Sequence, residues 1–214
     1  MAEQDVHSIV VVGDMNPQIF HPLWFAREGL LTESEAEEAE VKLVHPDIVA
    51  FSADWLEAQV TREKFIIKTK MEAYFEPLRD LAIGTFSLLA HTPLRAVGVN
   101  FDRHVKIRED KLEELTNKFA PKNFWEEKGL NTQFEGISVS IDKSTVEHPL
   151  RFLKIKIEPS ALIENGIFLN LNYHTQLKPR AGKENFGDQL VAILNQDWAS
   201  MKKEIDQITK KITH

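Results

Sequence analysis

The chain has 214 residues, of which 43% are hydrophobic and 28% are charged, with no cysteine and a formal net charge of −7 at pH 7. This composition is typical of a globular protein and excludes a largely disordered chain. The absence of cysteine excludes disulfides and thiolate metal sites, and the negative charge disfavours binding to a phosphate backbone.

Nothing in the sequence predicts a membrane segment or an export signal. The longest apolar runs, such as residues 9–12, are far shorter than the ~20 residues that a membrane-spanning helix needs. The opening residues MAEQDVHS have no basic patch followed by an apolar stretch, so we expect no signal peptide. Together with the lack of cysteine, these features predict a cytoplasmic protein.

The first elements are predicted to be short. Residues 8–14 (SIVVVGD) predict a buried strand that ends in a turn, and residues 16–31 predict a proline-punctuated segment with a short helix. Thr32 and Glu35 then have the spacing of a capping box, which predicts the start of an acidic, solvated helix.

The next segment predicts strands followed by a long helix. Residues 41–69 predict two strands, around VKLVHPDIVAFSA and KFIIKT, with Pro46 at a sheet edge or a strand start. From Tyr74 the apolar residues recur every three or four positions, which predicts an amphipathic helix that ends before Pro93.

The later part of the chain predicts four half-buried strands and two more helices. Four segments alternate strictly between apolar and polar residues, which is the signature of a strand with one buried face. These strands are residues 95–107, 136–142, 150–158 and 166–175. The three-and-four spacing of apolar residues predicts a helix at about 109–119 and a long closing helix at about 184–212.

These elements predict an α+β fold. A sheet with one apolar face and one polar face needs cover on one side only, which favours antiparallel pairing. We therefore expect a mostly antiparallel sheet covered on one face by two long amphipathic helices. We expect a single domain over residues 1–214, with two loosely similar β-rich plus helix halves at 1–107 and 108–214 as an alternative.

Three segments in the first half of the chain carry a resemblance. They are NPQIFHPLWFAREGLL (16–31), DWLEAQVTREKFIIKT (54–69) and LRDLAIGTFSLLAHTPLRAVGVN (78–100). In these segments the chain resembles a group of small uncharacterised bacterial proteins, through prolines, aromatic residues and a buried helix. The resemblance implies a bacterial or phage origin and carries no activity.

The polar positions of the alternating strands are the first set of candidate binding residues. They are Asn100, Asp102 and His104 on one strand, and Asn170, Asn172 and His174 on another. A carboxylate beside an imidazole can orient a general base, and two histidines with one carboxylate can bind a metal. Because polar side chains on an open sheet face are usually solvated or paired across strands, we predict no catalytic residue, metal or cofactor.

A basic loop forms the second set of candidates. Lys178 and Arg180 lie just before the closing helix, whose N-terminal N–H groups also favour anions. Phe152 and Phe168 share the polar face with lysines and asparagines, a combination found on sheets that stack single-stranded bases. The sequence contains neither a phosphate-binding glycine loop nor a serine nucleophile elbow.

These observations favour a non-enzymatic protein that binds another protein through its open polar sheet face, as an accessory or immunity-type subunit of a bacterial or phage system. The expected partner is another protein, such as a basic one, or a second copy of the chain. Two alternatives remain open. One is a domain that binds a small anionic ligand or nucleotide, with or without catalysis, and the other is single-stranded nucleic-acid binding on the sheet.

Overall fold

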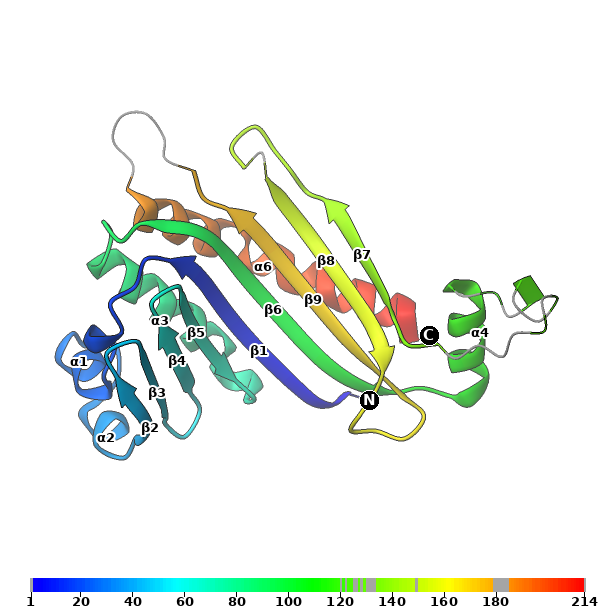
Figure 1. The fold of residues 1–214 in the computed structure, drawn as a ribbon, viewed down its shortest axis with the longest axis horizontal. Coiled ribbons are helices and arrows are strands. Elements are labelled where there is room, and N and C mark those ends of the chain that lie inside the picture. The colour runs from blue at the N-terminus through cyan, green and yellow to red at the C-terminus, as the bar shows by residue number, and fades with distance from the viewer. Residues whose placement is uncertain are drawn as a thin grey trace.

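The computed structural model describes residues 2–119, 121, 123–124, 127, 129, 134–148, 150–178 and 185–213. Its centre is a nine-stranded antiparallel sheet, and α-helices pack against one face of that sheet (Figure 1). The α+β architecture predicted from the alternating strands is thus confirmed.

The strands follow one another in space in the order β2-β3-β4-β5-β1-β6-β9-β8-β7, and every neighbouring pair is antiparallel. β2 and β7 are therefore the two edges. The central pairing of β6 with β9 joins strands from residues 1–107 to strands from residues 108–214. The bounds are β1 (Ala2–Gly13), β2 (Glu40–His45), β3 (Ile48–Ser52), β4 (Glu57–Thr61), β5 (Lys64–Thr69), β6 (Leu94–Lys106), β7 (Ile137–Asp142), β8 (Arg151–Pro159) and β9 (Gly166–Gln176).

Two long helices cover the apolar side of the sheet. α3 contacts β1 and β5, α6 contacts β6 and β9, and the two helices also contact each other. Figure 1 shows α6 crossing obliquely behind β6, β9 and β8. The bounds are η1 (Pro17–Ile19), α1 (Pro22–Arg27), α2 (Glu33–Glu37), η2 (Glu72–Tyr74), α3 (Phe75–Leu88), α4 (Glu109–Phe119) and α6 (Phe186–Thr213). Over the described residues, no helix has the length and apolar content needed to cross a bilayer.

The core lies between the sheet and these two helices. Phe75 of α3 packs against Phe101 of β6 and Trp198 of α6, with ring centroids 5.0 and 4.3 Å apart. At Gly187 the start of α6 approaches α3 so closely that a Cβ atom would lie 2.3 Å from the carbonyl oxygen of Phe86. A glycine is therefore required where the two helices meet.

Residues 40–69 form four strands, so the prediction of two strands was wrong. β2 and β3 are joined by a turn that contains Pro46. Pro46 therefore directly follows the edge strand β2 and does not lie inside it. β4 and β5 are joined at Arg62 and Glu63, where neither glycine nor proline marks the turn. The Thr61 hydroxyl accepts hydrogen bonds from the N–H groups of Glu63 and Lys64 and stabilises this turn instead.

The capping box predicted at Thr32 and Glu35 is confirmed at the start of α2. Glu35 also accepts a hydrogen bond from Nε1 of Trp55 at 2.7 Å. This bond ties the short acidic helix to the connection between β3 and β4. Partial burial acts to raise the pKa of Glu35, but the hydrogen bonds from Thr32 and Trp55 outweigh it and lower the pKa below the ordinary value.

Candidate protein-binding face

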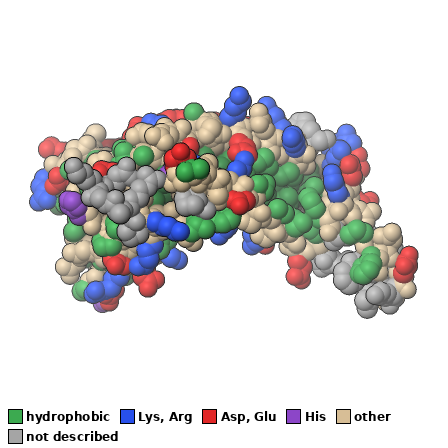
Figure 2. All heavy atoms as spheres, turned by 90° about the horizontal axis from the view of Figure 1, so that it is seen from above, with side chains coloured by type: hydrophobic (Ala, Val, Ile, Leu, Met, Phe, Trp, Pro, Cys, Tyr) green, Lys and Arg blue, Asp and Glu red, His purple; other side chains and the backbone are tan. Residues whose placement is uncertain are grey.

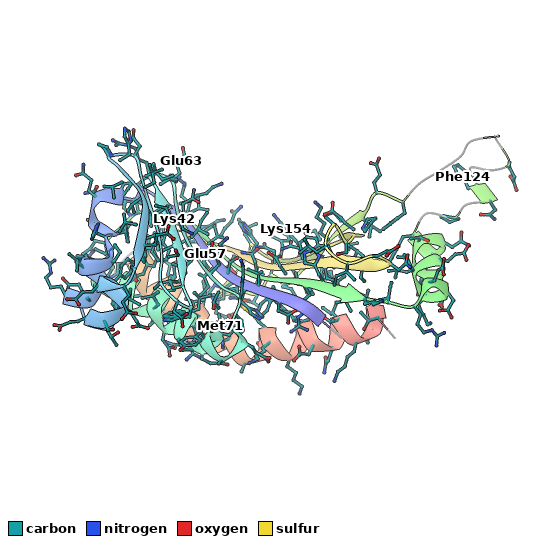
Figure 3. All side chains as sticks on the ribbon, turned by 90° about the horizontal axis from the view of Figure 1, so that it is seen from below. Lys42, Glu57, Glu63, Met71, Phe124 and Lys154 are labelled. Atoms are coloured by element: carbon teal, nitrogen blue, oxygen red, sulfur yellow. The ribbon has the colours of Figure 1, made fainter. Side chains whose placement is uncertain are left out.

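The face of the sheet opposite α3 and α6 is the candidate site. The pairing of β6 with β9 and of β9 with β8 places the even-numbered residues of these strands together on it. Figure 3 shows Lys154 on the side of the sheet away from α6. In the same view this side is concave: the strands that carry Lys42 and Glu57 rise at one end, and Phe124 lies raised at the other. We call this surface of β1, β3, β4, β5, β6, β8 and β9 the open face.

Two hydrogen-bonded pairs lie at the centre of the open face. Asn172 of β9 donates from Nδ2 to Oδ1 of Asn100 on β6, and Asn170 donates from Nδ2 to Oδ1 of Asp102. In each pair the two residues lie directly opposite each other in the β6–β9 register. We call these four residues the amide ladder. The structure therefore brings together four of the predicted site residues.

The Asp102 carboxylate is partly withdrawn from water. Burial raises its pKa above the ordinary value for aspartate, while the hydrogen bond from Asn170 and the nearby His104 act in the opposite direction. The carboxylate is thus a fixed acceptor within the ladder.

His104 is held by neighbours on two sides. Its Nδ1 lies 2.9 Å from Oγ of Ser160, and its ring centroid lies 4.8 Å from that of Phe168. Ser160 Oγ also accepts hydrogen bonds from the N–H groups of Leu162 and Ile163 in the loop after β8. The imidazole is thereby fixed against the loop that connects β8 to β9.

His174 does not join Asp102 and His104. His174 lies opposite Gly98, whereas Asp102 lies opposite Asn170, four residues further along the strand. At ~3.3 Å per residue, this register separates His174 from Asp102 by roughly 13 Å along the sheet. The two-histidine, one-carboxylate arrangement is therefore not formed. Across the described residues, no group of three or more histidine, aspartate or glutamate side chains could hold a metal ion.

The surroundings of His174 also disfavour its charged form. Burial and the charge of Lys154 lower its pKa below the ordinary histidine value. His174 lies opposite Phe152 in the β8–β9 register. The predicted Phe152 and Phe168 therefore both lie beside histidines on the open face.

The basic loop is only partly within the described residues. Lys178 is exposed just after β9, and its carbonyl oxygen accepts a hydrogen bond from Nε2 of Gln189 on α6 at 3.0 Å. Arg180 lies outside the described residues. The anion-binding role predicted for this loop stays a prediction.

Two lysines border the amide ladder on β8. Lys154 and Lys156 are exposed and lie opposite Asn172 and Asn170 in the β8–β9 register. Lys156 forms an ion pair with Glu158 at 2.7 Å. These lysines extend the polar surface of the ladder toward β7.

A hollow of about 200 Å³ lies on the open face at its raised end. Ala50, Gln59 and Ile66, which lie in one cross-strand row, form its floor. Its rim carries Glu57 and Lys68, which form an ion pair at 2.9 Å. The sequence did not predict this hollow, because β4 was not recognised as a separate strand.

Charged residues under α6 were also missed by the sequence interpretation. Arg103 has the same parity along β6 as the buried Phe101 and Val105, so it points toward the helices. Arg151 at the start of β8 likewise lies on the helix side and pairs with Asp197 of α6 at 2.7 Å. A charged residue at an apolar position of an alternating strand is the signal that could have found both.

No family model matches this sequence, and no curated protein matches it.

Proposed function

We propose that this chain is a protein-binding module that receives its partner on the open face, as an accessory or immunity-type subunit of a bacterial or phage system. The observation that carries the proposal is the amide ladder, a set of polar side chains already fixed by hydrogen bonds on a concave face that no described helix covers.

The ladder supports recognition because its side chains are ordered before binding. Each asparagine amide has two N–H donors and an oxygen with two lone pairs, so the single bond within each pair leaves further capacity. A partner that uses these groups avoids much of the entropy cost of immobilising side chains. The ladder thus offers direction and selectivity in hydrogen bonding.

The hollow supplies a complementary anchor. A volume of about 200 Å³ suits one large side chain from a partner. Protein interfaces commonly concentrate binding energy where a few anchor residues fill such pockets. With Ile66 in its floor and the ion pair of Glu57 and Lys68 at its rim, the hollow favours an apolar side chain with a polar end.

In this proposal charge contributes to binding both at long range, during encounter, and at contact distance. The net charge of −7 favours encounter with a basic protein, because electrostatics mainly sets association rate and selectivity. At contact distance, Lys154 and Lys156 favour carboxylate or amide side chains opposite the ladder. A basic partner with an acidic contact patch fits both conditions.

The two alternatives have weaker support. A ligand site built from Asp102, His104 and His174 lacks its geometry, because the register separates His174 from the other two. For single-stranded nucleic acid, the Phe168 ring is already in contact with His104 and offers less surface for stacking a base.

Affinity capture from the source organism, with tagged full-length chain, tests the proposal. We compare the wild type with K154E/K156E, which reverses charge beside the ladder, and with A50F, which fills the hollow. Lys203→Glu on α6 is the matched control, because Lys203 is exposed on the opposite side of the molecule. We expect a partner that is retained by the wild type and by the control and lost by both open-face variants.

Capture of no partner at low and moderate salt would contradict the proposal. Equal retention of the partner by all four proteins would place binding elsewhere and would also contradict it. Circular dichroism and thermal melting of each variant separate loss of binding from loss of folding.

A further inference from the structure

The outer edge of β7 exposes unpaired backbone groups. β7 is the last strand of the sheet, with β8 on its inner side. The N–H of Lys143 bonds to the carbonyl of Arg151 at 2.9 Å, so Lys143 and every second residue before it face β8. The backbone groups of Ser138, Ser140 and Asp142 therefore point outward. No described strand or helix pairs with them.

The helix-facing side of β7 is apolar and exposed. The side chain of Val139 is 41% exposed and that of Ile141 is 38% exposed. Ile137 and Ile155 beside them are half-buried. Figure 2 shows hydrophobic side chains gathered over β7 and the C-terminal part of α6.

The opposite edge of the sheet has the usual protection against strand pairing. β2 carries Glu40 and Lys42, and its pairing with β3 has a bulge between Val41 and Leu43. Edge charges and bulges are devices that discourage a further strand from adding to a sheet. By contrast, residues 137–141 contain no charge and no proline, and their pairing with β8 is regular. The two edges therefore differ in a way that favours pairing at β7.

We propose that a second copy of this chain pairs with β7 in antiparallel orientation about a twofold axis at Val139. In this register Val139 faces Val139 of the second copy, Ile137 faces Ile141, and Ser138 faces Ser140. Apolar residues then meet apolar residues on one face and serines meet serines on the other, as cross-strand pairing favours. The outward backbone groups of Ser138 and Ser140 bond to each other, as directly opposite hydrogen-bonded residues do.

The sequence of β7 favours a second copy of this chain as the partner of the strand. A twofold interface needs a surface that is complementary to itself, and residues 137–141 read as apolar, serine, apolar, serine, apolar in both directions. Because the axis is perpendicular to the sheet, both sets of helices lie on the same side. The two open faces then lie on the other side and remain accessible, so the dimer is independent of the proposed partner binding.

Introducing a charge at the twofold axis tests the proposal. Sedimentation of the full chain over a wide range of concentrations should give a monomer–dimer equilibrium. V139K should weaken self-association by more than about tenfold, because two ammonium groups then face each other. V139E should do the same, and an equimolar mixture of V139K and V139E should restore the dimer. V44K on the exposed edge β2 is the matched control and should associate like the wild type.

Several outcomes would overturn the proposal. A wild type that sediments as a monomer at every concentration excludes the dimer. Unchanged association in V139K, or loss of association in V44K instead, places the interface elsewhere. A mixture of V139K and V139E that stays monomeric excludes the register at Val139. Because Val139 is exposed, the variants should keep the wild-type circular dichroism spectrum, and this measurement guards against misfolding.

Discussion

Arg103 on β6 forms an ion pair with Asp206 of α6, with 3.2 Å between Nη1 and Oδ1. The same guanidinium pairs with Asp5 on β1 at 3.2 Å through Nε. The Arg103 side chain is only 17% exposed. Arg103 therefore connects the central strands β1 and β6 to the C-terminal half of α6.

The first prediction concerns this ion pair. Arg103→Met should lower the free energy of unfolding by about 3–5 kcal/mol, because it leaves the Asp5 carboxylate partly buried without its partner. Asp206→Asn should cost less than about 1 kcal/mol, because Asp206 is about half exposed. Urea unfolding of both variants measures the difference. Adding Asp5→Asn to Arg103→Met should recover part of the loss, and no recovery would mean that the loss comes from packing.

The second prediction tests whether the sheet is covered on one side. Leu169→Ala should cost about 2–5 kcal/mol, because Leu169 is fully buried under the helices. Ile155→Ala should fall at or below the lower end of that range, because Ile155 is half-buried near the β7 edge. Lys154→Ala, next to it on the open face, should stay within about 0.5 kcal/mol. Equal losses at Leu169 and Lys154 in chemical denaturation would contradict a one-sided sheet.

The third prediction is a loss of stability in acid that depends on His7. His7 is buried, with its ring centroid 4.2 Å from that of Phe75. Burial, helped by the charges of Arg103 and Lys202, lowers its pKa from about 6.5 to about 4, while Asp206 and Glu76 oppose this shift. Between these two values the unfolded chain binds the proton and the folded chain does not, so stability falls as the pH falls through that window.

The size of this effect should be about 3 kcal/mol over the whole window. Thermal or urea unfolding of wild type and His7→Gln, at pH values above and below the window, isolates the contribution. Asp5 and Asp102 act in the opposite direction, because burial raises their pKa values and the folded state retains their protons more readily. The difference between the two proteins is therefore the informative quantity. A parallel pH dependence in both would refute the role of His7.

The fourth prediction concerns the contact between α3 and α6. Alanine is the better helix former, and in an exposed helix Gly→Ala gains up to about 1 kcal/mol. Gly187→Ala should instead destabilise the protein by about 1–3 kcal/mol, because the new methyl group meets the carbonyl of Phe86 and the backbone of Ala90. Gln196→Ala at an exposed position of α6 is the control and should be close to neutral. A stabilised Gly187→Ala variant would show that the helices separate easily.

Much of the fold could be predicted from the sequence where a pattern is local. The alternation that includes Val99 and Asn100 predicted β6 and its two faces, and the same pattern predicted β7, β8 and β9. The capping box at Thr32 was likewise recognised from a spacing of three residues. The division of residues 40–69 into four strands was missed, because the turn at Arg62 and Glu63 depends on a threonine hydroxyl and not on glycine or proline.

The candidate site could likewise be predicted only in part from the sequence. Alternation placed Asp102, His104 and His174 on one face, and the structure agrees. It could not place His174 relative to the other two, because the register of β6 against β9 is set by the pairing of residues sixty or more positions apart in sequence. The ion pair of Arg103 with Asp206 depends on the same kind of long-range contact, whereas the hollow at Ile66 was missed because β4 was not recognised as a separate strand.

By itself, the sequence determined which side of each alternating strand is apolar, because side-chain direction in a strand follows from the backbone alone. Only the tertiary structure decided which strands are neighbours and which one lies at the edge, because those contacts depend on the packing of the whole chain. The Ile137–Ile141 segment alternates like the β9 strand around Leu169, yet one lies at the margin and the other lies in the core.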